Sequence, residues 1–202
     1  MFLGKWNRSV IITYLGVAFA VAGILLVILS QLEYAICCLI VAGICDLFDG
    51  LYARRCKRNE EEKEFGVQLD SLADVMDFIA LPIAVFIGAG LKSPGFVLLF
   101  AFFAICGIAR LAYFNMNTAS TKGPIDYYSG LPVTYTALIV PLVLLLKYVL
   151  VGQFFVIILS VVIVSVSALN ILKVKVKKPR GLAYVFFSLL AIAMLVVYTV
   201  VL

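Results

Sequence analysis

Long runs of apolar residues alternate with short polar and charged segments along the whole chain. Seven of these runs are long enough to cross about 30 Å of hydrocarbon as helices of roughly 20 residues. They extend approximately over Val10–Ser30, Tyr34–Ala53, Gly66–Gly90, Gly95–Asn115, Pro132–Val151, Phe154–Leu172 and Leu182–Leu202. The pattern predicts an all-α, polytopic membrane helix bundle, and we expect residues 1–202 to form a single integral membrane domain.

The composition agrees with this setting and argues against two common kinds of metal site. Hydrophobic residues make up 65% of the chain, charged residues 13%, and the mean hydropathy is +1.17, far more apolar than a soluble domain. The chain has no histidine, and its five cysteines form no C-x-x-C pair. A zinc or haem site built on these ligands is therefore not expected.

The distribution of positive charge predicts the orientation in the membrane. With a cytoplasmic N-terminus, 13 of the 16 Lys and Arg residues fall on the cytoplasmic side, Arg110 lies close to it, and Lys92 and Lys147 lie outside. The positive-inside rule favours this arrangement and, with seven spans, an external C-terminus. We expect a protein of the cell (cytoplasmic) membrane that binds no nucleic acid, because the cations form juxtamembrane clusters.

Four carboxylates lie within the apolar segments, where an ionised group is costly unless it is paired or functional. Asp46 and Asp49 end the second predicted span, and Asp70 and Asp74 begin the third, at the same membrane level. Spacings of three and four residues place each pair on one helical face. The charged segment 55–64 between the two spans is interpreted as a solvated cytoplasmic turn. The four side chains are therefore expected to converge.

Such a cluster predicts a metal site. Four neighbouring carboxylates repel one another unless cations neutralise them. Oxygen ligands without histidine or thiolate suit Mg²⁺ or Mn²⁺, and two such ions can lie about 3.5–4 Å apart, an arrangement that supports phosphoryl transfer. Gly50 and Gly66 leave helix surface free for a bulky group, and Arg54 can bind a phosphate through its planar fork of donors.

The pattern D-x-x-D-G-x-x-A-R followed by G-x-x-x-D-x-x-x-D resembles the signature of the CDP-alcohol phosphatidyltransferases. It is matched by Asp46, Asp49, Gly50, Ala53, Arg54, Gly66, Asp70 and Asp74. Eleven residues separate Arg54 from Gly66, where the usual signature has eight, and we interpret the excess as a longer turn. The resemblance implies a six-helix core, here with about one further span, and a homodimer.

The segments Ser71–Asp74, Cys106–Asn115 and Gly130–Pro132 are similar to the phosphatidylserine synthases of this family. That resemblance implies transfer of a phosphatidyl or archaetidyl group from a CDP-linked lipid to the hydroxyl of L-serine, with release of CMP. Two positions depart from the usual pattern, namely Tyr113, where arginine is common, and Asp77, where serine is common. Asp77 is interpreted as a group beyond the metal ligands or exposed to water.

The resemblance also implies roles for particular residues. The two metal ions would be held by Asp46, Asp49, Asp70 and Asp74, with Asp74 also acting as general base. The expected nucleotide and CDP-lipid contacts are Asn7, Thr13, Gly50, Ala53, Arg54 and Gly66. The candidates for binding serine are Arg110, Lys122, Tyr127 and Ser129.

Two alternatives stay open at this point. A member of the same family could use glycerol phosphate or inositol phosphate as acceptor, although a phosphorylated acceptor calls for a denser cationic pocket. A membrane transporter would also place acidic residues in its pathway, but it would not explain the glycine, alanine and arginine spacing. The last two spans carry no legible motif and are interpreted as packing or dimer-contact helices.

Overall fold

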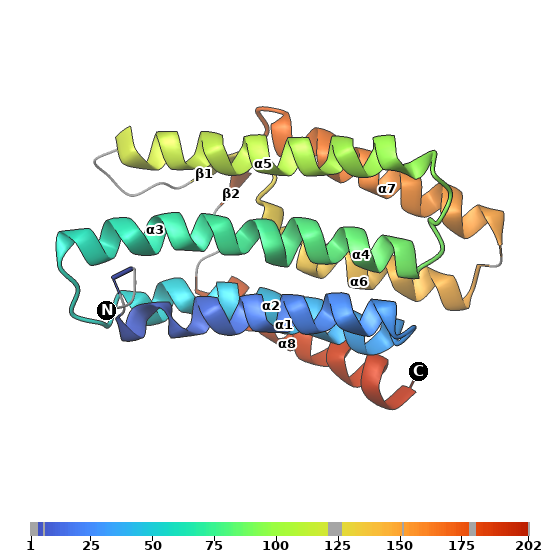
Figure 1. Ribbon diagram of the computed structural model, residues 1–202, viewed down its shortest axis with the longest axis horizontal. Coiled ribbons are helices and arrows are strands. Elements are labelled where there is room, and N and C mark those ends of the chain that lie inside the picture. Colours follow the sequence, from blue (N-terminus) through green and yellow to red (C-terminus); the bar gives the residue numbers. More distant parts are fainter. Residues whose placement is uncertain (1–3, 6, 121–126, 151, 178–180, 202) are drawn as a thin grey trace.

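The computed structural model describes residues 4–5, 7–120, 127–150, 152–177 and 181–201. Its α-helices are α1 (Ile11–Ile28), α2 (Leu32–Ala53), α3 (Glu60–Val75), α4 (Leu81–Gly88), α5 (Phe96–Ser120), α6 (Thr136–Leu144), α7 (Gln153–Ile171) and α8 (Leu182–Val196). Two short strands, β1 (Tyr127–Ser129) and β2 (Lys175–Lys177), complete the fold (Figure 1).

The predicted helix bundle is confirmed. Six helical segments of the described chain are long and apolar enough to cross a membrane, and a shorter apolar helix covers Val133–Tyr148. This shorter helix corresponds to the fifth predicted span and contains Pro141 within α6. The third span is continuous from Glu60 to Gly88. It joins α3 to α4 through a π-helical turn, Met76–Ala80.

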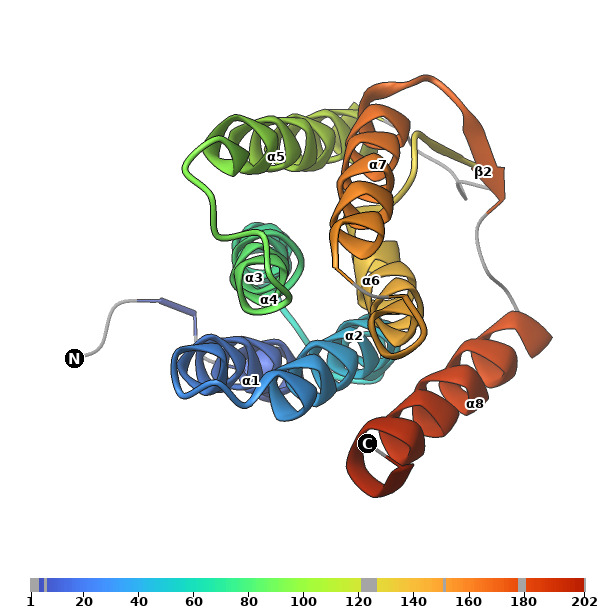
Figure 2. The same cartoon turned by 90° about the vertical axis from the view of Figure 1, so that its right-hand side faces the viewer.

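The helices surround a shared apolar core. Viewed along the bundle, α3 and α4 lie between α1 and α5, while α8 lies at the outer edge beside α2 and α6 (Figure 2). The Phe86 ring packs against Phe100 and Phe103 from α5, with centroids 6.4 and 5.6 Å apart. Apolar side chains also cover the outer faces of the helices, as expected of surfaces that contact lipid.

Helix α3 begins inside the segment that the sequence predicted to be a turn. Asn59 caps the helix: its side chain accepts a hydrogen bond from the Glu62 N–H, and the Glu62 carboxylate accepts one from the Asn59 N–H, both at 2.8 Å. This capping box satisfies backbone donors that would otherwise lack partners. The prediction of a turn up to Glu64 was therefore wrong, because the N-x-x-E signal starts a helix at Glu60.

Asp77 lies in the π-helical turn. The Leu81 N–H donates to the Met76 carbonyl five residues earlier, and Pro82, which follows, has no N–H to continue the ordinary ladder. Prolines and π-helical turns are both common sites at which a helix changes direction. The turn fixes the direction in which Asp77 leaves the helix, and Asp77 is 4% exposed. The alternative that Asp77 faces water is therefore wrong.

The strands β1 and β2 form a small antiparallel sheet that ties together two loops, with Tyr128 opposite Val176. Directly after β1, Gly130 adopts φ +81°, and its N–H donates to the Val174 carbonyl at 2.8 Å. A β-carbon on Gly130 would lie 2.5 Å from the Asn170 carbonyl oxygen. The loop can therefore pack against the end of α7 only because residue 130 is glycine.

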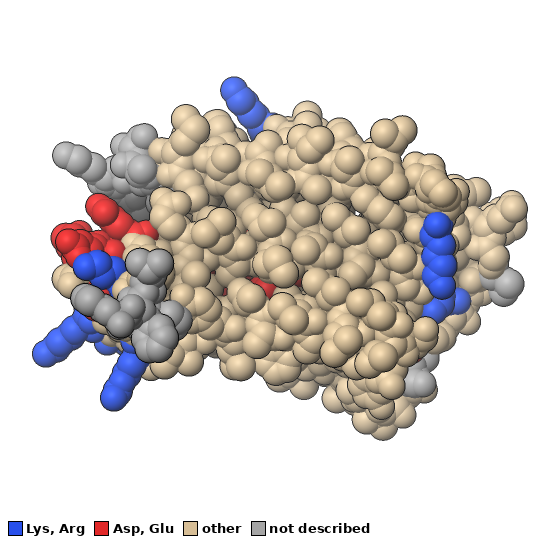
Figure 3. All heavy atoms as spheres, in the orientation of Figure 1, with Lys and Arg blue, Asp and Glu red and all other residues tan. Residues whose placement is uncertain are grey.

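Charged side chains gather at one end of the molecule. In Figure 3, acidic and basic atoms cluster at the end that contains the N-terminus and the start of α3, whereas the middle of the visible face is almost free of them. At this end Lys5 forms an ion pair with Glu61 at 2.5 Å. The uncharged middle matches a hydrocarbon-facing belt.

Gly130→Ala is predicted to destabilise the protein by about 1–3 kcal/mol, because it combines a strained φ with a clash against backbone. The thermal unfolding midpoint in detergent should fall by roughly 2 °C or more. Gly152→Ala is the matched control, since Gly152 also has a positive φ, +69°, but its β-carbon would meet nothing within 4 Å. Equal midpoints for the two variants would contradict this role of the Asn170 contact.

Candidate active site

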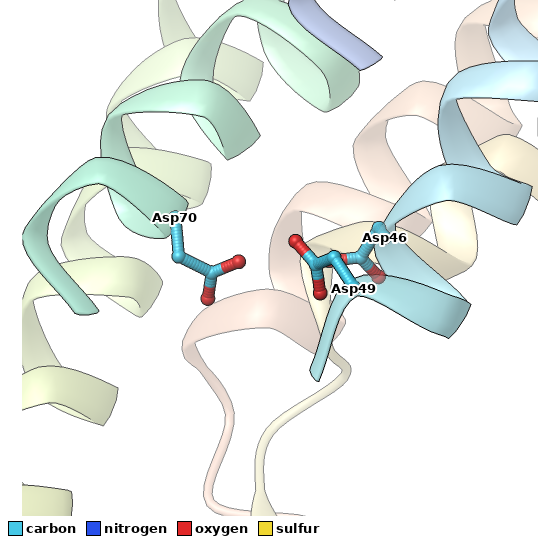
Figure 4. Close-up of side chains that lie close together, drawn as sticks. All are labelled: Asp46, Asp49 and Asp70. Atoms are coloured by element: carbon cyan, nitrogen blue, oxygen red, sulfur yellow. The ribbon is translucent and has the colours of Figure 1, made fainter. Parts of the chain in front are cut away.

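Three carboxylates from two neighbouring helices meet near the charged end of the bundle. Asp46 and Asp49 come from the last two turns of α2, and Asp70 comes from α3. Each offers one ligand oxygen, and these oxygens lie within 4.8 Å of one another. Figure 4 shows the three side chains pointing toward a common space between the helices. The structure thus brings together three of the four carboxylates that the spacing predicted to converge.

Helix α1 supports the cluster from a third side. The Thr13 hydroxyl donates a hydrogen bond to Asp49 Oδ2 at 2.9 Å, and both side chains are buried. This bond fixes the orientation of one carboxylate of the cluster. Asp74 lies one turn after Asp70 and is also buried. Asp74 lines a cavity beside the cluster together with Asp46, Asp49 and Asp70, but it is not one of the three residues with mutually close ligand atoms.

The donor set fits a divalent cation. In the described part of the chain, the ion pairs are Lys5–Glu61 and Lys63–Glu60, and neither involves the cluster. The mutual repulsion of Asp46, Asp49 and Asp70 is therefore not offset by a salt bridge to a neighbouring side chain. Carboxylate oxygens without nitrogen or sulfur ligands suit Mg²⁺ or Mn²⁺. These residues can thus hold a hard cation.

A cavity of about 220 Å³ opens on one side of the cluster, between α1, α2 and α3. Five of the six residues predicted to contact the nucleotide and CDP-lipid line it, namely Thr13, Gly50, Ala53, Arg54 and Gly66. A β-carbon on Gly50 would meet nothing within 4 Å, and one on Gly66 would meet only the Arg58 guanidinium, at 3.6 Å. Both glycines therefore leave room for a bulky group.

Asn7, the sixth predicted nucleotide contact, does not line this cavity. Its side-chain oxygen accepts a hydrogen bond from the Ser9 N–H at 3.1 Å, and its amide donates to the Lys57 carbonyl at 3.2 Å. Asn7 therefore caps the short helical turn before α1 and ties it to the α2–α3 loop. This contact helps to position Thr13 from a distance.

A second cavity, of about 280 Å³, opens on the other side of the cluster. Asp49, Gly50, Arg54 and Asp70 line both cavities, so the two compartments meet at the carboxylates. The second cavity is also lined by Asp46, Asp74, Arg110, Phe114, Tyr128, Thr134, Tyr135 and Tyr184. Its walls come from α2, α3, α5, β1, the start of the α6 segment and α8.

Arg110 is a buried cation in this second cavity. It is 5% exposed, and its Nε has no hydrogen-bond partner among the described residues. Its guanidinium carbon lies 5.1 Å from the Phe114 ring centroid and 6.0 Å from that of Tyr128. The rings hold the guanidinium by cation–π contact and leave its donors available. The site can therefore bind an anionic group away from bulk water.

Helix α5, which carries Arg110, is tied to α3 beside the cluster. The Asn115 amide donates to Ser71 Oγ at 2.8 Å, and the Ser71 hydroxyl donates to the Asn115 carbonyl oxygen at 3.1 Å. Ser71 directly follows Asp70. This reciprocal pair therefore fixes the distance between the arginine and the carboxylates.

The alternation of side chains along β1 decides which tyrosine enters the cavity. Tyr128 points inward, whereas Tyr127 and Ser129, the predicted serine contacts, are exposed and line neither cavity. Successive residues of a strand face opposite sides. Burial raises the pKa of Tyr128 to about 12, so its hydroxyl stays protonated at neutral pH. Lys122, the remaining candidate, lies outside the described residues.

Helix α8 also contributes to the cavity. Tyr184 lines it, and Phe187 packs edge-on against Tyr135, with ring centroids 5.8 Å apart. Farther along the same segment, the Tyr198 hydroxyl donates to the Pro141 carbonyl at 2.6 Å. Helix α8 thus packs against the bundle, as the sequence interpretation expected, and in addition contributes Tyr184 to the cavity. No motif around Tyr184 indicates a role in the site. Its place in the cavity becomes evident only from the packing of α8 against α2.

An apolar groove leads from the cluster into the bundle wall. It has a volume of about 80 Å³ and lies between α2, α6 and α8. Its lining includes Ile40, Leu138 and Ala191, with Asp46 at the end that meets the second cavity. A ligand with an anionic end and an apolar tail would match this arrangement, with the anionic end at the carboxylate cluster and the tail in the apolar groove.

Curated proteins with similar sequences act on lipids. The chain is 37% identical over 107 residues to the CDP-diacylglycerol–serine O-phosphatidyltransferase of Saccharomyces cerevisiae, covering 50% of this chain and 38% of that protein. It is 33% identical over 121 residues to the enzyme of the same name from Helicobacter pylori, covering 58% and 49%. It is 28% identical over 160 residues to the archaetidylserine synthase of Methanothermobacter thermautotrophicus, covering 79% and 64%.

These matches span between 38% and 64% of the relatives' own lengths. The match to a family is more extensive, since the family model described as CDP-alcohol phosphatidyltransferase covers residues 6–202. It includes both helices of the carboxylate cluster and α8 as well. The chain therefore belongs to the CDP-alcohol phosphatidyltransferase family.

Proposed function

We propose that this protein transfers the phosphatidyl or archaetidyl group of a CDP-linked lipid to the hydroxyl of L-serine and releases CMP. The observation that carries the proposal is the placement of a buried arginine, Arg110, in the cavity that also contains Asp74 and the carboxylate cluster. Serine brings a carboxylate that the guanidinium can bind and a hydroxyl that Asp74 can deprotonate. The names of the relatives from yeast, Helicobacter and Methanothermobacter support the same acceptor.

The two cavities suggest a division of the substrates. The compartment around Gly50, Ala53 and Gly66 has the open helix surfaces that a cytidine needs, and Arg54 borders it with a phosphate-binding fork. The apolar groove beside Ala191 would receive lipid tails, since it ends at Asp46. The diphosphate would then lie over the carboxylates, where the two compartments meet.

The chemical step follows from this placement. The serine hydroxyl oxygen attacks the lipid-side phosphorus, the bond from that phosphorus to the CMP oxygen breaks, and Asp74 accepts the hydroxyl proton. When bound, the divalent cations, for which we propose two Mg²⁺ or Mn²⁺ ions, neutralise the diphosphate and stabilise charge on the leaving phosphate. Thr13 keeps Asp49 oriented toward the cluster. Arg110 fixes the acceptor so that its hydroxyl faces the phosphorus.

Phosphorylated acceptors fit this cavity less well. Glycerol phosphate and inositol phosphate carry a dianionic group, whereas the described cations that line the cavity are Arg54 and Arg110. Arg54 also borders the nucleotide compartment, so Arg110 is left for the acceptor. A transporter is not favoured either, because the family match covers residues 6–202.

We further propose that the active site of this integral membrane protein faces the cytoplasm and that the protein lies in the cell membrane. Charged side chains gather at the end of the molecule that contains the N-terminus and the start of α3 (Figure 3), and Asp46 and Asp49 lie in the half of α2 that leads to α3. Positive charge is retained on the cytoplasmic side of membrane proteins. The homodimer that the family resemblance implies stays a prediction.

A transferase assay with purified protein tests the function. CMP release should require a CDP-linked lipid, L-serine and Mg²⁺ or Mn²⁺ together, with the lipid product carrying radiolabel from serine. Glycerol phosphate and inositol phosphate are the comparison acceptors. Correctly folded protein that releases no CMP with serine and metal would overturn the assignment, and faster release with a phosphorylated acceptor would reassign the substrate.

Asp74→Asn is predicted to lower kcat by about 10²–10⁴-fold, because the general base is lost. Binding of the CDP-lipid should be partly retained, since Asp46, Asp49 and Asp70 stay in place. Steady-state CMP release and equilibrium binding of the lipid measure the two effects. Glu64→Gln, an exposed acidic position on the same helix, should leave both unchanged. Full turnover of Asp74→Asn would exclude the base role.

Arg110→Ala is predicted to raise the KM for serine about 10-fold or more, as expected when a charge-assisted hydrogen bond is lost. The KM for the CDP-lipid should change much less. Arg110→Lys keeps the charge but not the fork and should be intermediate. Arg55→Ala removes an exposed arginine that lines neither cavity and serves as control. Equal increases in both KM values would argue against a serine-specific role.

A further inference from the structure

A fifth aspartate lies beneath the cluster, deeper in the bundle. Asp77 comes from the π-helical turn after α3 and is 4% exposed. Together with Asp46, Asp49, Asp70 and Asp74, it lines a small cavity that Thr13 and Cys45 also border. It is not one of the three residues whose ligand oxygens lie within 4.8 Å of one another. Asp77 therefore borders the cluster, but its oxygens are not among the closely spaced oxygens of Asp46, Asp49 and Asp70.

One oxygen of this carboxylate is unsatisfied. Asp77 Oδ1 is fully buried and has no hydrogen-bond partner among the described residues. The neighbouring Thr13 hydroxyl already donates to Asp49, and the Cys45 thiol is a weak donor. Leaving a buried carboxylate oxygen without a partner is costly. A donor from outside the described chain is therefore expected. The cavity beside Asp77 has no room for a water molecule with the carboxylates in this arrangement, so we expect the donor to enter together with a cation that moves them.

The surrounding helices are shaped to admit this carboxylate. On α1, Gly16 faces Asp77, and a β-carbon on Gly16 would lie 2.7 Å from Asp77 Oδ2. On the other side, the π-helical turn fixes the direction of the side chain, and such turns are frequent at functional sites. Two independent features of the backbone thus accommodate a residue that would be costly in a purely structural position.

We propose that Asp77 is a positioning residue of the metal centre, whose carboxylate accepts hydrogen bonds from water bound to the divalent cation held by Asp46, Asp49 and Asp70. The inference rests on the proposed function for the presence of that cation. Groups that accept hydrogen bonds from the ligands of a metal orient them and commonly change metal affinity by about 10–100-fold. Asp77 thus acts through metal-bound water and does not touch the substrate.

The test measures Mn²⁺ binding to the purified protein, residues 1–202, without substrate, from the electron paramagnetic resonance signal of free Mn²⁺. Asp77→Asn keeps the size of the side chain and is expected to weaken Mn²⁺ binding about 10-fold. The thermal midpoint of the metal-free variant should not fall, because one of five crowded carboxylates is removed. The rise in midpoint on adding Mn²⁺ should shrink.

Asp70→Asn is the reference variant, since it removes a direct ligand and should weaken Mn²⁺ binding more strongly. Loss of binding in Asp70→Asn with unchanged affinity in Asp77→Asn would overturn the role of Asp77 and leave the proposed function standing. No effect in Asp70→Asn would instead overturn the metal site itself. A parallel fall in Mn²⁺ affinity and metal-free midpoint for Asp77→Asn would assign Asp77 to packing.

Gly16→Ala gives a second approach, because it displaces the Asp77 carboxylate without removing it. This variant should also weaken Mn²⁺ binding, and its effect should vanish in the Asp77→Asn background if it acts through Asp77. Such non-additivity is the signature of a shared interaction. Gly23→Ala controls for crowding alone. Gly23 is also on α1, and its β-carbon would lie 2.7 Å from Leu81, which belongs to the same continuous span, Glu60–Gly88, as Asp77. Additive effects of Gly16→Ala and Asp77→Asn would contradict the inference.

Discussion

The cost of holding several carboxylates together inside an apolar bundle governs the organisation of this protein. Asp46, Asp49 and Asp70 meet with no salt bridge to a described cation, and buried like charges of this kind demand a compensating partner. Thr13 supplies one hydrogen bond and Gly16 leaves space for a further carboxylate. Under the proposed function, a divalent cation would satisfy the remaining oxygens, and the helices around the cluster would form a frame for that ion.

The same cluster separates two chemical environments. On one side, glycine and alanine on α2 and α3 leave a compartment bordered by Arg54. On the other side, Arg110 is buried against aromatic rings beside Asp74. An apolar groove between α2, α6 and α8 reaches the cluster from the bundle wall. Water-soluble and lipid parts of a substrate could thus approach the same carboxylates from different directions, which a transfer between a lipid donor and a polar acceptor requires.

Connections far apart in the sequence hold the acceptor side in place. The β1–β2 pair joins the loop before α6 to the segment after α7 and turns Tyr128 inward. The reciprocal bonds between Ser71 and Asn115 set α5 against α3, and the Tyr198 hydroxyl anchors the end of the α8 segment to Pro141. The first two contacts join elements that carry cavity residues, and the third holds the α8 segment against α6. The positions of Arg110, Tyr128 and Tyr184 therefore depend on packing between elements rather than on any local motif.

The sequence by itself determined the membrane bundle, the convergence of Asp46, Asp49 and Asp70, and the glycines that flank them, because apolar run length and helical spacing are local properties. The predicted start of α3 was too late, because Asn59 was assigned to a turn although it caps the helix. The sequence pattern also does not indicate which side chains of β1 face inward. Only the tertiary structure placed Tyr184 in the cavity, turned Asn7 into a cap and buried Asp77 beneath the cluster. These outcomes depend on how distant helices pack, and no periodicity within one segment encodes that packing.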